Sequence, residues 1–519
     1  MKPAYLAATV RAAEEPLLEA LPGVLMQRAS AGLASSVLRE LRSVRPEGVY
    51  GARILLIVGA GNNGGDALYA GARLLGRGVQ AHAWTTSERV HERAWAAFVA
   101  AGGLAVDPMT ALAELPGCDL VIDGVLGIGG RPGLDPPVAL FARACADIGV
   151  PVVAVDLPSG LAADSCAAAV EPVETGLSTD EGVSTGSTGD GVSTRSTDDG
   201  VPTGDQDPVT GASTFRAALT VTFGGPKFCH VLEPAASACG RVQLVDIGLE
   251  LPEPDLRCWE SVDVSAAWPF PDAGSDKYSR GVLGLDTGSD AFPGAAVLST
   301  LGAVHAGPGM IRFAGAEAAV PLIRQAAPNV VYGEGRAQAR VLGCGWGNRP
   351  DGAEAVQRAL DEGLPLLLDA DALRFLPEGR LGDQVPLTPH AGELAGLLNV
   401  ARAEVTADPL EAVRRGAQWL GATVLLKGAT QYVCGPDGAV SIAVPGPSWT
   451  AQAGSGDVLA GICGTLLAAG LPPARAALAG ASIQALAATA CPGPHPPQTI
   501  ASEVSRVVAS LRPWCRSVE

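Results

Sequence analysis

The chain has 519 residues, of which 47% are hydrophobic and 17% charged, and its formal net charge is −18. This length predicts two to four domains that each bury a core, and the hydrophobic content excludes a wholly disordered chain. The acidic balance argues against a nucleic-acid partner or an anionic membrane surface, and no apolar run is long enough to predict a membrane span. The 11 scattered cysteines form no C-x-x-C pair and the N-terminus lacks an apolar signal core, so we expect a cytoplasmic protein with reduced thiols.

Short apolar runs alternate with helical patterns in the N-terminal half. We expect strands at 53–58, 79–84, 120–122, 151–155, 218–223 and 241–247, with helices at 66–75 and 138–148 among them. Near-continuous apolar strands that alternate with helices indicate a parallel sheet covered on both faces. We therefore expect an α/β domain, bounded at residues 1–252.

The segment Pro172–Asp207 interrupts this domain with a different composition. A Gly-Val-Ser-Thr or Gly-Val-Pro-Thr unit recurs every nine residues, and residues 171–207 hold nine acids and one arginine, a net charge of −8. Such a polar segment cannot bury enough apolar surface to offset its ordering entropy. We predict a disordered acidic insert at about 172–207.

A second α/β series follows a proline-containing connector at Glu250–Asp255. Its expected strands are 281–285, 339–342, 365–368, 384–387, 423–426 and 431–434, and its expected helices are 295–306, 352–360, 409–420 and 456–469. The alternation again predicts parallel strands covered by helices. We expect a second domain over residues 260–519.

A glycine-rich turn, Gly59–Asp66, joins the first expected strand to a helix. Its G-x-G-x-x-G spacing suits backbone approach to a phosphate at a helix N-terminus, although the next strand, 79–84, ends without the acid that would hold a ribose. Asp123 and Asp156 follow two further strands of the same sheet. Two interpretations are open for these features: ligand-binding turns, or a tight glycine turn and two helix caps.

Oxygen-bearing side chains gather in these turns. Asn63, Asp123 and Ser159 suit a hard cation, which leaves Asp66 and Asp156 for ligand hydroxyls or protons. Lys227 is one of only four lysines among 36 basic residues, and lysine suits phosphate or acid/base chemistry. Its alternative is an ordinary surface charge.

In the C-terminal half, Ala453-Gly454-Ser455-Gly456-Asp457 opens an apolar helix. Glycines at a helix N-terminus form an anion hole for a phosphoryl group, and the aspartate is placed to take a proton from an attacking hydroxyl. The alternative is an acid that only favours the helix dipole. Other strand-end turns carry Lys427–Gln431 and His390. A further strand end carries Asp369 and Asp371, and these two acids could orient magnesium through water or cap a helix.

The N-terminal motifs, in order, resemble the NAD(P)H-hydrate epimerase family: Leu25–Gly32, G-N-N-G-G-D, D-G-V-L-G-I-G, V-D-L-P-S-G and T-F-G-G-P-K. The resemblance implies a Rossmann-like three-layer sandwich that interconverts the R and S epimers of hydrated NAD(P)H, with K⁺ held by Asn63, Asp123 and Ser159. It also implies the substrate contacts Asn62, Asn63, Gly64, Gly65, Asp66, Gly127, Ile128, Gly129, Gly130, Arg131, Pro132, Gly133 and Asp156. As a hypothesis, we assign proton handling to Asp156 and Lys227.

The C-terminal motifs D-A-D-A-L, T-P-H-A-G-E, L-K-G-A-T and G-S-G-D resemble the ribokinase-like NAD(P)H-hydrate dehydratases from about Ser261 onward. The resemblance implies that the domain uses ADP, with Mg²⁺, to phosphorylate the hydroxyl of the S-hydrate, with Asp457 as the base. The phosphorylated hydrate then loses phosphate. The implied substrate contacts are Ala295, Gly345, His390 and Asp457, and the implied nucleotide contacts are Lys427, Gly428, Ala429, Thr430, Gln431, Gly454, Ser455 and Gly456. Two turns depart from the family pattern: Asp286–Ser289 replaces G-G-S, and Gly343-Cys344-Gly345 replaces G-P-G.

Both halves thus point to one damaged cofactor, with NADHX and NADPHX as substrates, ADP as co-substrate and a homo-oligomer as the expected assembly. Two other interpretations are open. One is a ribokinase-like kinase for a vitamin precursor with a regulatory N-terminal half, and the other is an N-terminal domain that only binds nucleotides and scaffolds.

Overall fold

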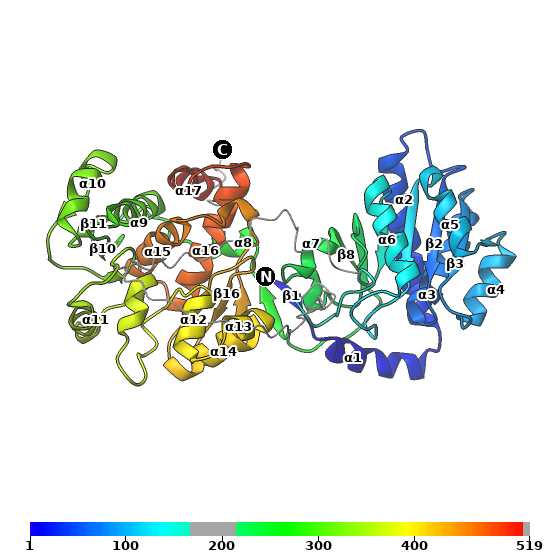
Figure 1. Cartoon of the computed structure of the whole chain (residues 1–519), viewed down its shortest axis with the longest axis horizontal. Helices are drawn as coiled ribbons and strands as arrows, with labels where there is room; N and C mark the ends of the chain where they lie inside the picture. Colours follow the sequence, from blue (N-terminus) through cyan, green and yellow to red (C-terminus); the bar gives the residue numbers. More distant parts are fainter. Residues whose placement is uncertain (167–213, 512–519) are drawn as a thin grey trace, which may run out of the picture. The chain divides into compact units, whose positions relative to one another are not determined.

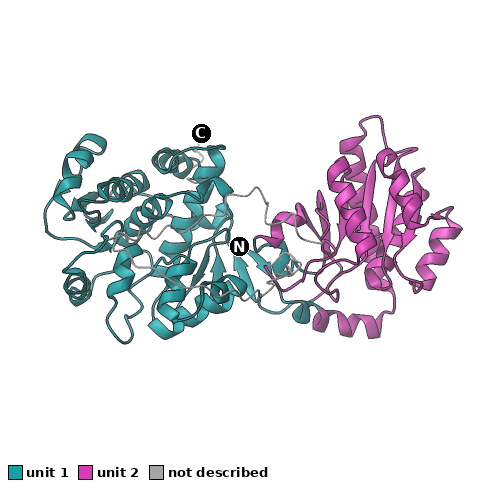
Figure 2. Cartoon of the chain, viewed as in Figure 1, with its two compact units in different colours: residues 1–10, 225–233, 250–519 teal, residues 11–224, 234–249 magenta. Residues whose placement is uncertain are grey.

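The computed structural model describes residues 1–166 and 214–511, so the predicted disordered insert at about 172–207 lies outside the described residues. The chain forms two compact units, each of which is built from more than one segment (Figure 2). Unit 1 comprises Met1–Val10, Gly225–Glu233 and Glu250–Glu519, and unit 2 comprises Arg11–Gly224 and Pro234–Leu249. Both ends of the chain therefore belong to unit 1.

Unit 2 is built on a parallel seven-stranded sheet in the order β4-β3-β2-β5-β6-β7-β8 (Figure 1). Its strands are β2 (Arg53–Val58), β3 (Gln80–Thr85), β4 (Leu104–Ala105), β5 (Leu120–Gly124), β6 (Val152–Val155), β7 (Leu219–Phe223) and β8 (Arg241–Val245). Its helices are α2 (Val24–Val44), α3 (Asn62–Leu75), α4 (Glu92–Ala100), α5 (Pro108–Glu114), α6 (Pro136–Ile148) and α7 (Ala235–Cys239), and α1 (Ala7–Ala20) precedes them.

Alternation along β2 shows why this sheet has helices on both faces. Ile54, Leu56 and Val58 pack into one core with α2, α3 and α4, whereas Leu55 and Ile57 pack into a second core with α5 and α6. Because successive side chains of a strand point to opposite faces, a strand that is apolar at every position needs cover on both. The predicted three-layer α/β sandwich is confirmed.

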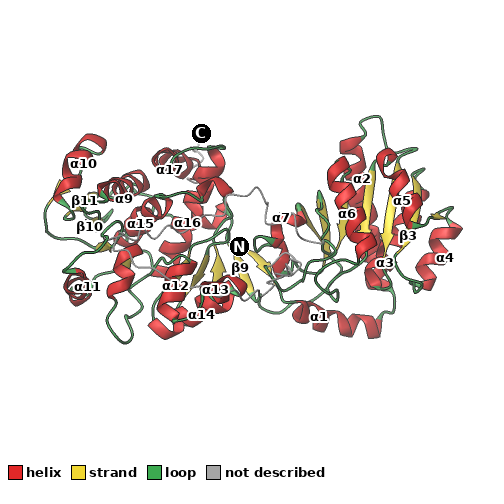
Figure 3. Cartoon of the chain, in the orientation of Figure 1, coloured by secondary structure: helices red, strands yellow, loops and turns green. Residues whose placement is uncertain are grey.

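Unit 1 contains two five-stranded sheets, and its helices and strands are distinguished in Figure 3. The first is parallel, with β10 (Val282–Asp286), β11 (Met310–Phe313), β12 (Val331–Tyr332), β13 (Ala339–Leu342) and β14 (Leu366–Leu368). The second is mixed, in the order β1-β9-β17-β16-β15, with β1 (Lys2–Ala4), β9 (Leu256–Cys258), β15 (Val424–Leu426), β16 (Tyr432–Cys434) and β17 (Val440–Ile442).

The strand expected at 384–387 is wrong, because only Leu387 pairs there. Leu387 forms isolated parallel bridges to Leu368 and to Val424, and so links the two sheets at one residue. Pro386 precedes it and has no N–H for a ladder. A proline at this position therefore limits the connection to a single pair.

The helices of unit 1 surround α15 (Ser455–Ala468), in which every residue from Val458 onward is buried. It packs with α9 (Pro293–Ala306), α16 (Pro473–Ala490) and α17 (Pro497–Leu511) in one apolar core. The remaining helices of this unit are α8 (Ser261–Ala267), α10 (Val320–Ala326), α11 (Gly352–Asp361), α12 (Ala391–Leu398), α13 (Arg402–Ala407) and α14 (Pro409–Leu420). No described helix is both long and apolar enough to cross a membrane.

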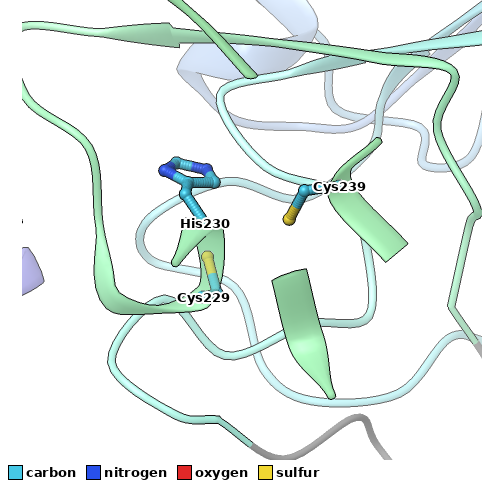
Figure 4. A group of neighbouring side chains, drawn as sticks. All are labelled: Cys229, His230 and Cys239. Carbon is cyan, nitrogen blue, oxygen red and sulfur yellow. The ribbon is translucent and has the colours of Figure 1, made fainter. Parts of the chain in front are cut away.

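The chain reaches unit 1 with its first residues, a feature that the sequence patterns did not predict. Strand β1 pairs antiparallel with β9, and the terminal ammonium of Met1 lies 2.7 Å from the carboxylate of Asp263. Two short helices later in the chain carry the three side chains that Figure 4 labels. Cys229 and His230 belong to the one-turn helix η2 (Phe228–His230) of unit 1, and Cys239 ends α7 of unit 2.

Two candidate active sites

In unit 2, the turn between β2 and α3 has no room for side chains at two of its glycines, Gly59 and Gly64. A Cβ atom on Gly59 would lie 1.9 Å from the Val125 carbonyl oxygen, and one on Gly64 would lie 2.1 Å from that of Gly59. A Cβ on Gly127 would lie 2.3 Å from the Asn63 side chain. These glycines bring Asn63, in the first turn of α3, against the loop that follows β5.

The three predicted cation ligands meet around the Leu126 carbonyl. Asn63 donates to that carbonyl at 3.0 Å and to the Val155 carbonyl at 2.6 Å, and the Ser159 hydroxyl also contacts the Leu126 carbonyl, at 3.3 Å. Ser159 donates its N–H and its hydroxyl to Asp123 at 2.7 and 2.6 Å. Asp123 lies within β5 rather than after it, so it is no helix cap.

Asp123 is a fully buried carboxylate that its neighbours only partly stabilise. Burial raises its pKa to about 6, against the lowering effect of the hydrogen bonds from Ser159 and Val125. None of its contacts with the described residues comes from a basic group. A buried anion of this kind fits a cation supplied from solution.

Asp66 and Asp156 are the other two acids of this site, and both are buried. Asp156 follows β6 with a φ of 67°, in the left-handed region that non-glycine residues rarely adopt, and it accepts a hydrogen bond from the Thr222 hydroxyl at 3.0 Å. This conformation excludes a role as a simple helix cap.

The predicted substrate segment Gly127–Gly133 forms the loop between β5 and α6. Arg11 donates to the Ile128 carbonyl at 2.7 Å, and the Gly133 N–H donates to the Gly160 carbonyl at 2.9 Å. Arg131 is paired with Asp135 on the exposed surface. The backbone of this loop is therefore anchored at both ends, while its middle is open to solvent.

Lys227 is 1% exposed, so its interpretation as a surface charge is wrong. Its N–H donates to His230 Nδ1 at 2.9 Å, and its backbone bridges to Tyr5. Lys227 belongs to unit 1, whereas the other predicted epimerase residues belong to unit 2. Its catalytic role stays a prediction.

In unit 1, the predicted catalytic turn opens α15. Gly454 caps the helix with a φ of +90°, and Asp457 lies in the first turn. A Cβ on Gly456 would lie 3.3 Å from Lys427 Nζ and 4.0 Å from Asp369 Oδ2, so this glycine brings the start of α15 close to both charges. The amides of this turn are thereby placed near a lysine ammonium.

Lys427 pairs with Asp369 at 2.6 Å, and the Thr388 hydroxyl donates to the same carboxylate oxygen at 2.7 Å. Asp369 follows β14, Thr388 follows the single bridge at Leu387, and Lys427 follows β15. Burial alone would lower the pKa of Lys427, but the charges of Asp369 and Glu393 raise it above its ordinary value. The site therefore keeps a permanent cation, and Asp369 is not a helix cap.

Asp457 shares this environment. Burial and the charge of Asp369 raise its pKa to about 7, against the lowering effects of Lys427 and of a hydrogen bond from Cys344. Cys344 is buried and its thiol lies 3.5 Å from Asp369 Oδ2. A carboxylate that titrates near neutral pH is suited to general-base catalysis, which favours the prediction of Asp457 as the base.

The predicted substrate-lining residues are close to this centre. A Cβ on Gly345 would lie 2.4 Å from that of Ala295, so these two positions are in contact. His390 caps α12, accepting the Glu393 N–H at 3.1 Å, and its backbone bridges to Lys427. Its ring lines a cavity of about 660 Å³ with Asp371, Arg374 and Trp419. A second cavity, of about 460 Å³, is lined by Asp286, Phe292 and Arg349, among others.

The predicted nucleotide residues include two buried polar atoms that lack a hydrogen-bond partner among the described residues. They are Gln431 Oε1 and Ser455 Oγ. Thr430 is engaged, because its hydroxyl accepts the Glu233 N–H at 2.8 Å. Unsatisfied buried polar atoms are costly, so the pair favours a ligand that would satisfy them.

Sequence reasoning placed Asp369 near magnesium but missed its pairing with Lys427, and it missed Thr388 and Cys344 as members of this centre. The signal for Cys344 was present, since the turn Gly343-Cys344-Gly345 directly follows an expected strand. A Cβ on Gly343 would lie 2.0 Å from the Asp369 carbonyl oxygen, which shows how closely the two turns pack.

Two family models match the chain. One described as NAD(P)H-hydrate dehydratase matches residues 283–509, and one described as YjeF-related protein N-terminus matches residues 22–186. The chain is 43% identical over 489 residues to the bifunctional NAD(P)H-hydrate repair enzyme Nnr of Mycobacterium tuberculosis, covering 92% of this chain and 91% of that protein.

Two further similarities concern the C-terminal half. The ADP-dependent (S)-NAD(P)H-hydrate dehydratase of Xanthomonas campestris is 34% identical over 242 residues, which cover 43% of this chain and 84% of that protein. The crystal structure of the ADP/ATP-dependent NAD(P)H-hydrate dehydratase of Bacillus subtilis, co-crystallised with ATP and Mg²⁺, is 29% identical with a TM-score of 0.47, covering 49% of this chain and 99% of that one.

Proposed function

Because the chain belongs to the bifunctional NAD(P)H-hydrate repair enzymes, we propose that each of its two sites performs one step of repair. The chain epimerises hydrated NAD(P)H and dehydrates the S epimer back to NAD(P)H. We assign epimerisation to residues 1–252 and dehydration to residues 260–519, a division that the family matches at 22–186 and 283–509 support. The substrates are NADHX and NADPHX.

For dehydration, we assign the base to Asp457. Its carboxylate takes the proton of the hydrate hydroxyl as that oxygen attacks the terminal phosphorus of ADP, and AMP leaves. The phosphate ester then eliminates phosphate, and the neighbouring ring carbon loses a proton, which restores the ring double bond. Lys427 and the amides of Gly454–Gly456 hold the negative charge of the transferring group. The observation that carries this assignment is the convergence of Asp457, Lys427 and Asp369 at the start of α15.

ADP as the phosphoryl donor is supported by the relative in Xanthomonas campestris, whose name specifies ADP. The nucleotide would contact Lys427–Gln431 and Gly454–Gly456. Magnesium, when bound with the nucleotide, supplies charge neutralisation at the phosphates, and Asp369 and Asp371 would orient its waters. The carboxylates fit this role, because Asp369 Oδ2 lies 3.5 Å from the Cys344 thiol, whereas the hydrogen bonds from Lys427 and Thr388 go to Oδ1.

For epimerisation, we propose that the substrate lies along Asn62–Asp66, Gly127–Gly133 and Asp156, with Asp156 as a proton-handling group. Potassium would be held by Asn63, Asp123 and Ser159, where it would neutralise the buried Asp123 carboxylate. Lys227 remains a candidate for a second proton-handling group. A cytoplasmic location and a homo-oligomeric assembly are also part of this proposal.

One experiment tests both activities. Purified protein is mixed with hydrated NADH as both epimers, Mg²⁺, K⁺ and either ADP or ATP, and the near-ultraviolet absorbance of dihydronicotinamide is followed. Full recovery supports two active sites, whereas recovery of about half of the material would show that the R epimer is stranded and the epimerase assignment is wrong. No recovery with either nucleotide would overturn the dehydratase assignment. A stable phosphorylated product without reduced nicotinamide would instead support a small-molecule kinase.

A further inference from the structure

Asp66 and Asp156 are two buried acids whose charges interact in unit 2. Asp66 is 6% exposed and Asp156 4%. The charge of Asp156 acts on Asp66, and so does that of Glu14, but none of the interactions that shift Asp66 comes from a basic group in the described part of the chain. Burial and a neighbouring like charge both disfavour the ionised form of a carboxyl group.

Asp66 also has an oxygen without a partner. Its Oδ1 is buried and receives no hydrogen bond from the described residues. An ionised carboxylate in this position would lose its hydration without compensation, whereas a neutral carboxyl loses much less and keeps an O–H to donate. The local structure therefore favours a protonated Asp66 that is aimed at a ligand. Consistently, burial and then the charges of Asp156 and Glu14 raise the pKa of Asp66 well above its ordinary value.

Asp156 is held in a different way. Its N–H donates to the Val221 carbonyl at 2.8 Å, and its Oδ1 accepts the Thr222 hydroxyl at 3.0 Å, both from β7. These bonds keep the residue at a φ of 67°, a strained conformation that tends to occur at functional sites. A hydrogen-bond donor on the carboxylate favours its ionised form.

We propose that Asp66 is a catalytic residue of epimerisation, the neutral acid of an acid–base pair in which Asp156 is the base. This inference rests on the proposed epimerase function and deepens it. The hydrate carries its hydroxyl on a ring carbon bonded to the ring nitrogen. Asp66 donates its proton to that hydroxyl, the carbon–oxygen bond breaks, water leaves, and the nitrogen lone pair forms a carbon–nitrogen double bond.

The return step uses the other acid. Water adds to the opposite face of the same carbon, its oxygen forms the new bond, the electron pair of the double bond returns to nitrogen, and one proton passes to Asp156. Transfer of this proton from Asp156 to Asp66 restores the starting state. Atoms and electrons balance without an oxidant, a reductant or a nucleotide, and the two carboxylates stabilise the transient ring cation between the steps.

The test variant is Asp66→Asn, because an amide can donate a hydrogen bond to the hydroxyl but cannot transfer the proton. We expect kcat for epimerisation to fall about 100-fold or more, with the Kd for the hydrate changed only a few fold. Dehydration of pure S-hydrate by the same protein should be unchanged, which controls for folding of the chain. Glu14→Gln is the matched control, since it removes the third acid outside the pair, and its epimerase rate should stay close to that of the wild type.

Two measurements do not depend on the rate. If Asp66 is neutral, its amide variant should melt no lower than Glu14→Gln, and a clearly lower Tm would indicate an ionised, paired Asp66 and overturn the inference. In water enriched in ¹⁸O, the epimerised product should gain the label, and retention of the original oxygen would exclude the bond cleavage.

The inference and the function on which it rests can fail separately. A wild-type protein that leaves the R epimer untouched would overturn the proposed epimerase function, and the inference with it. A wild type that epimerises, together with a fully active Asp66→Asn variant, would overturn the inference alone.

Discussion

The two sites deal with buried carboxylates in opposite ways. In unit 1, Asp369 is 1% exposed and pairs with Lys427 at 2.6 Å, so the protein supplies the cation itself. In unit 2, Asp123 is equally buried and receives hydrogen bonds from Ser159 and Val125, but none of its described contacts is basic. In unit 1, a lysine side chain balances the negative charge of the buried carboxylate. In unit 2, the balancing positive charge must come from a bound ion or a proton.

This difference matches the chemistry assigned to each site. A phosphoryl group carries negative charge into unit 1, where a fixed lysine remains useful throughout the reaction. Epimerisation moves a proton and passes through a positively charged ring, so carboxyl groups that exchange protons near the reacting carbon suit it. The electrostatics therefore predict different sensitivities to mutation, pH and salt in the two halves of one chain.

The largest expected effect comes from Asp457→Asn. Removing the general base should lower kcat for dehydration by about 10²–10⁴-fold, while epimerisation on the same chain stays at the wild-type rate. If both activities fall together, the two sites depend on each other and their electrostatics cannot be compared as those of independent sites. Unchanged dehydration would overturn the assignment of Asp457.

The fold of this variant can be checked through pH. Because its pKa is raised to about 7, Asp457 binds a proton in the folded state between its ordinary pKa and pH 7, and it costs stability as pH rises through that window. The amide removes this cost. Asp457→Asn should therefore melt no lower than the wild type at pH 8, and a lower Tm would mean that its inactivity reflects misfolding.

The second prediction concerns Lys427, the lysine that balances the buried carboxylate in the site of unit 1. Lys427→Met leaves the buried Asp369 without its cation, and breaking a buried pair in this way costs about 3–5 kcal/mol in the free energy of unfolding. Chemical denaturation should show this loss. The double variant Lys427→Met, Asp369→Asn removes both charges and should recover most of the stability but not the dehydratase activity. Equal stability of the single and double variants would show that the pair contributes little.

The sequence predicted those parts of the fold that depend on local pattern. β2 and β5 were found because their runs 54–58 and 120–122 are continuously apolar, which is typical of a strand covered on both faces. In contrast, β1 has three residues and pairs with β9, far along the chain, so nothing near Lys2–Ala4 indicates a strand. Helix α16 was missed because it is buried on nearly all sides and shows no polar face to set a period.

The sites were predictable to the same extent. Glycine turns with an acid after an apolar strand indicated Asp123 and Asp156, since local order alone places them at one edge of a sheet. A glycine turn that opens an apolar helix indicated Asp457. Pairing is different, because Asp369 and Lys427 are 58 residues apart and no spacing rule relates them. The unsatisfied oxygen of Asp66 likewise depends on which side chains fill the space around it, which only the packed structure shows.

A smaller effect is expected from pH. Asp457 must be ionised to accept a proton, so kcat/KM for the S-hydrate should fall about tenfold per pH unit below pH 7 and level off above it. Because the hydrogen bond from Cys344 lowers the pKa of Asp457, Cys344→Ala should move the midpoint to higher pH. Cys434→Ala, at another buried cysteine of unit 1, is the matched control and should leave the profile in place. A midpoint near pH 4 would show that Asp457 is not perturbed.

The smallest effect is expected in unit 2, where K⁺ bound near Asp123 should stabilise the folded protein. If K⁺ balances Asp123, the ion binds the folded state only, and at ten times its Kd it should add about 1.4 kcal/mol to the free energy of unfolding. This gain should be absent when Na⁺ or tetramethylammonium replaces K⁺, and absent with K⁺ in Asp123→Asn. Since burial raises the pKa of Asp123 to about 6, the gain should also fade as pH drops below 6 and the carboxylate takes up a proton. A K⁺ effect of equal size in Asp123→Asn would mean that the ion binds elsewhere, and unit 2 would then have to balance its buried charge with protons alone.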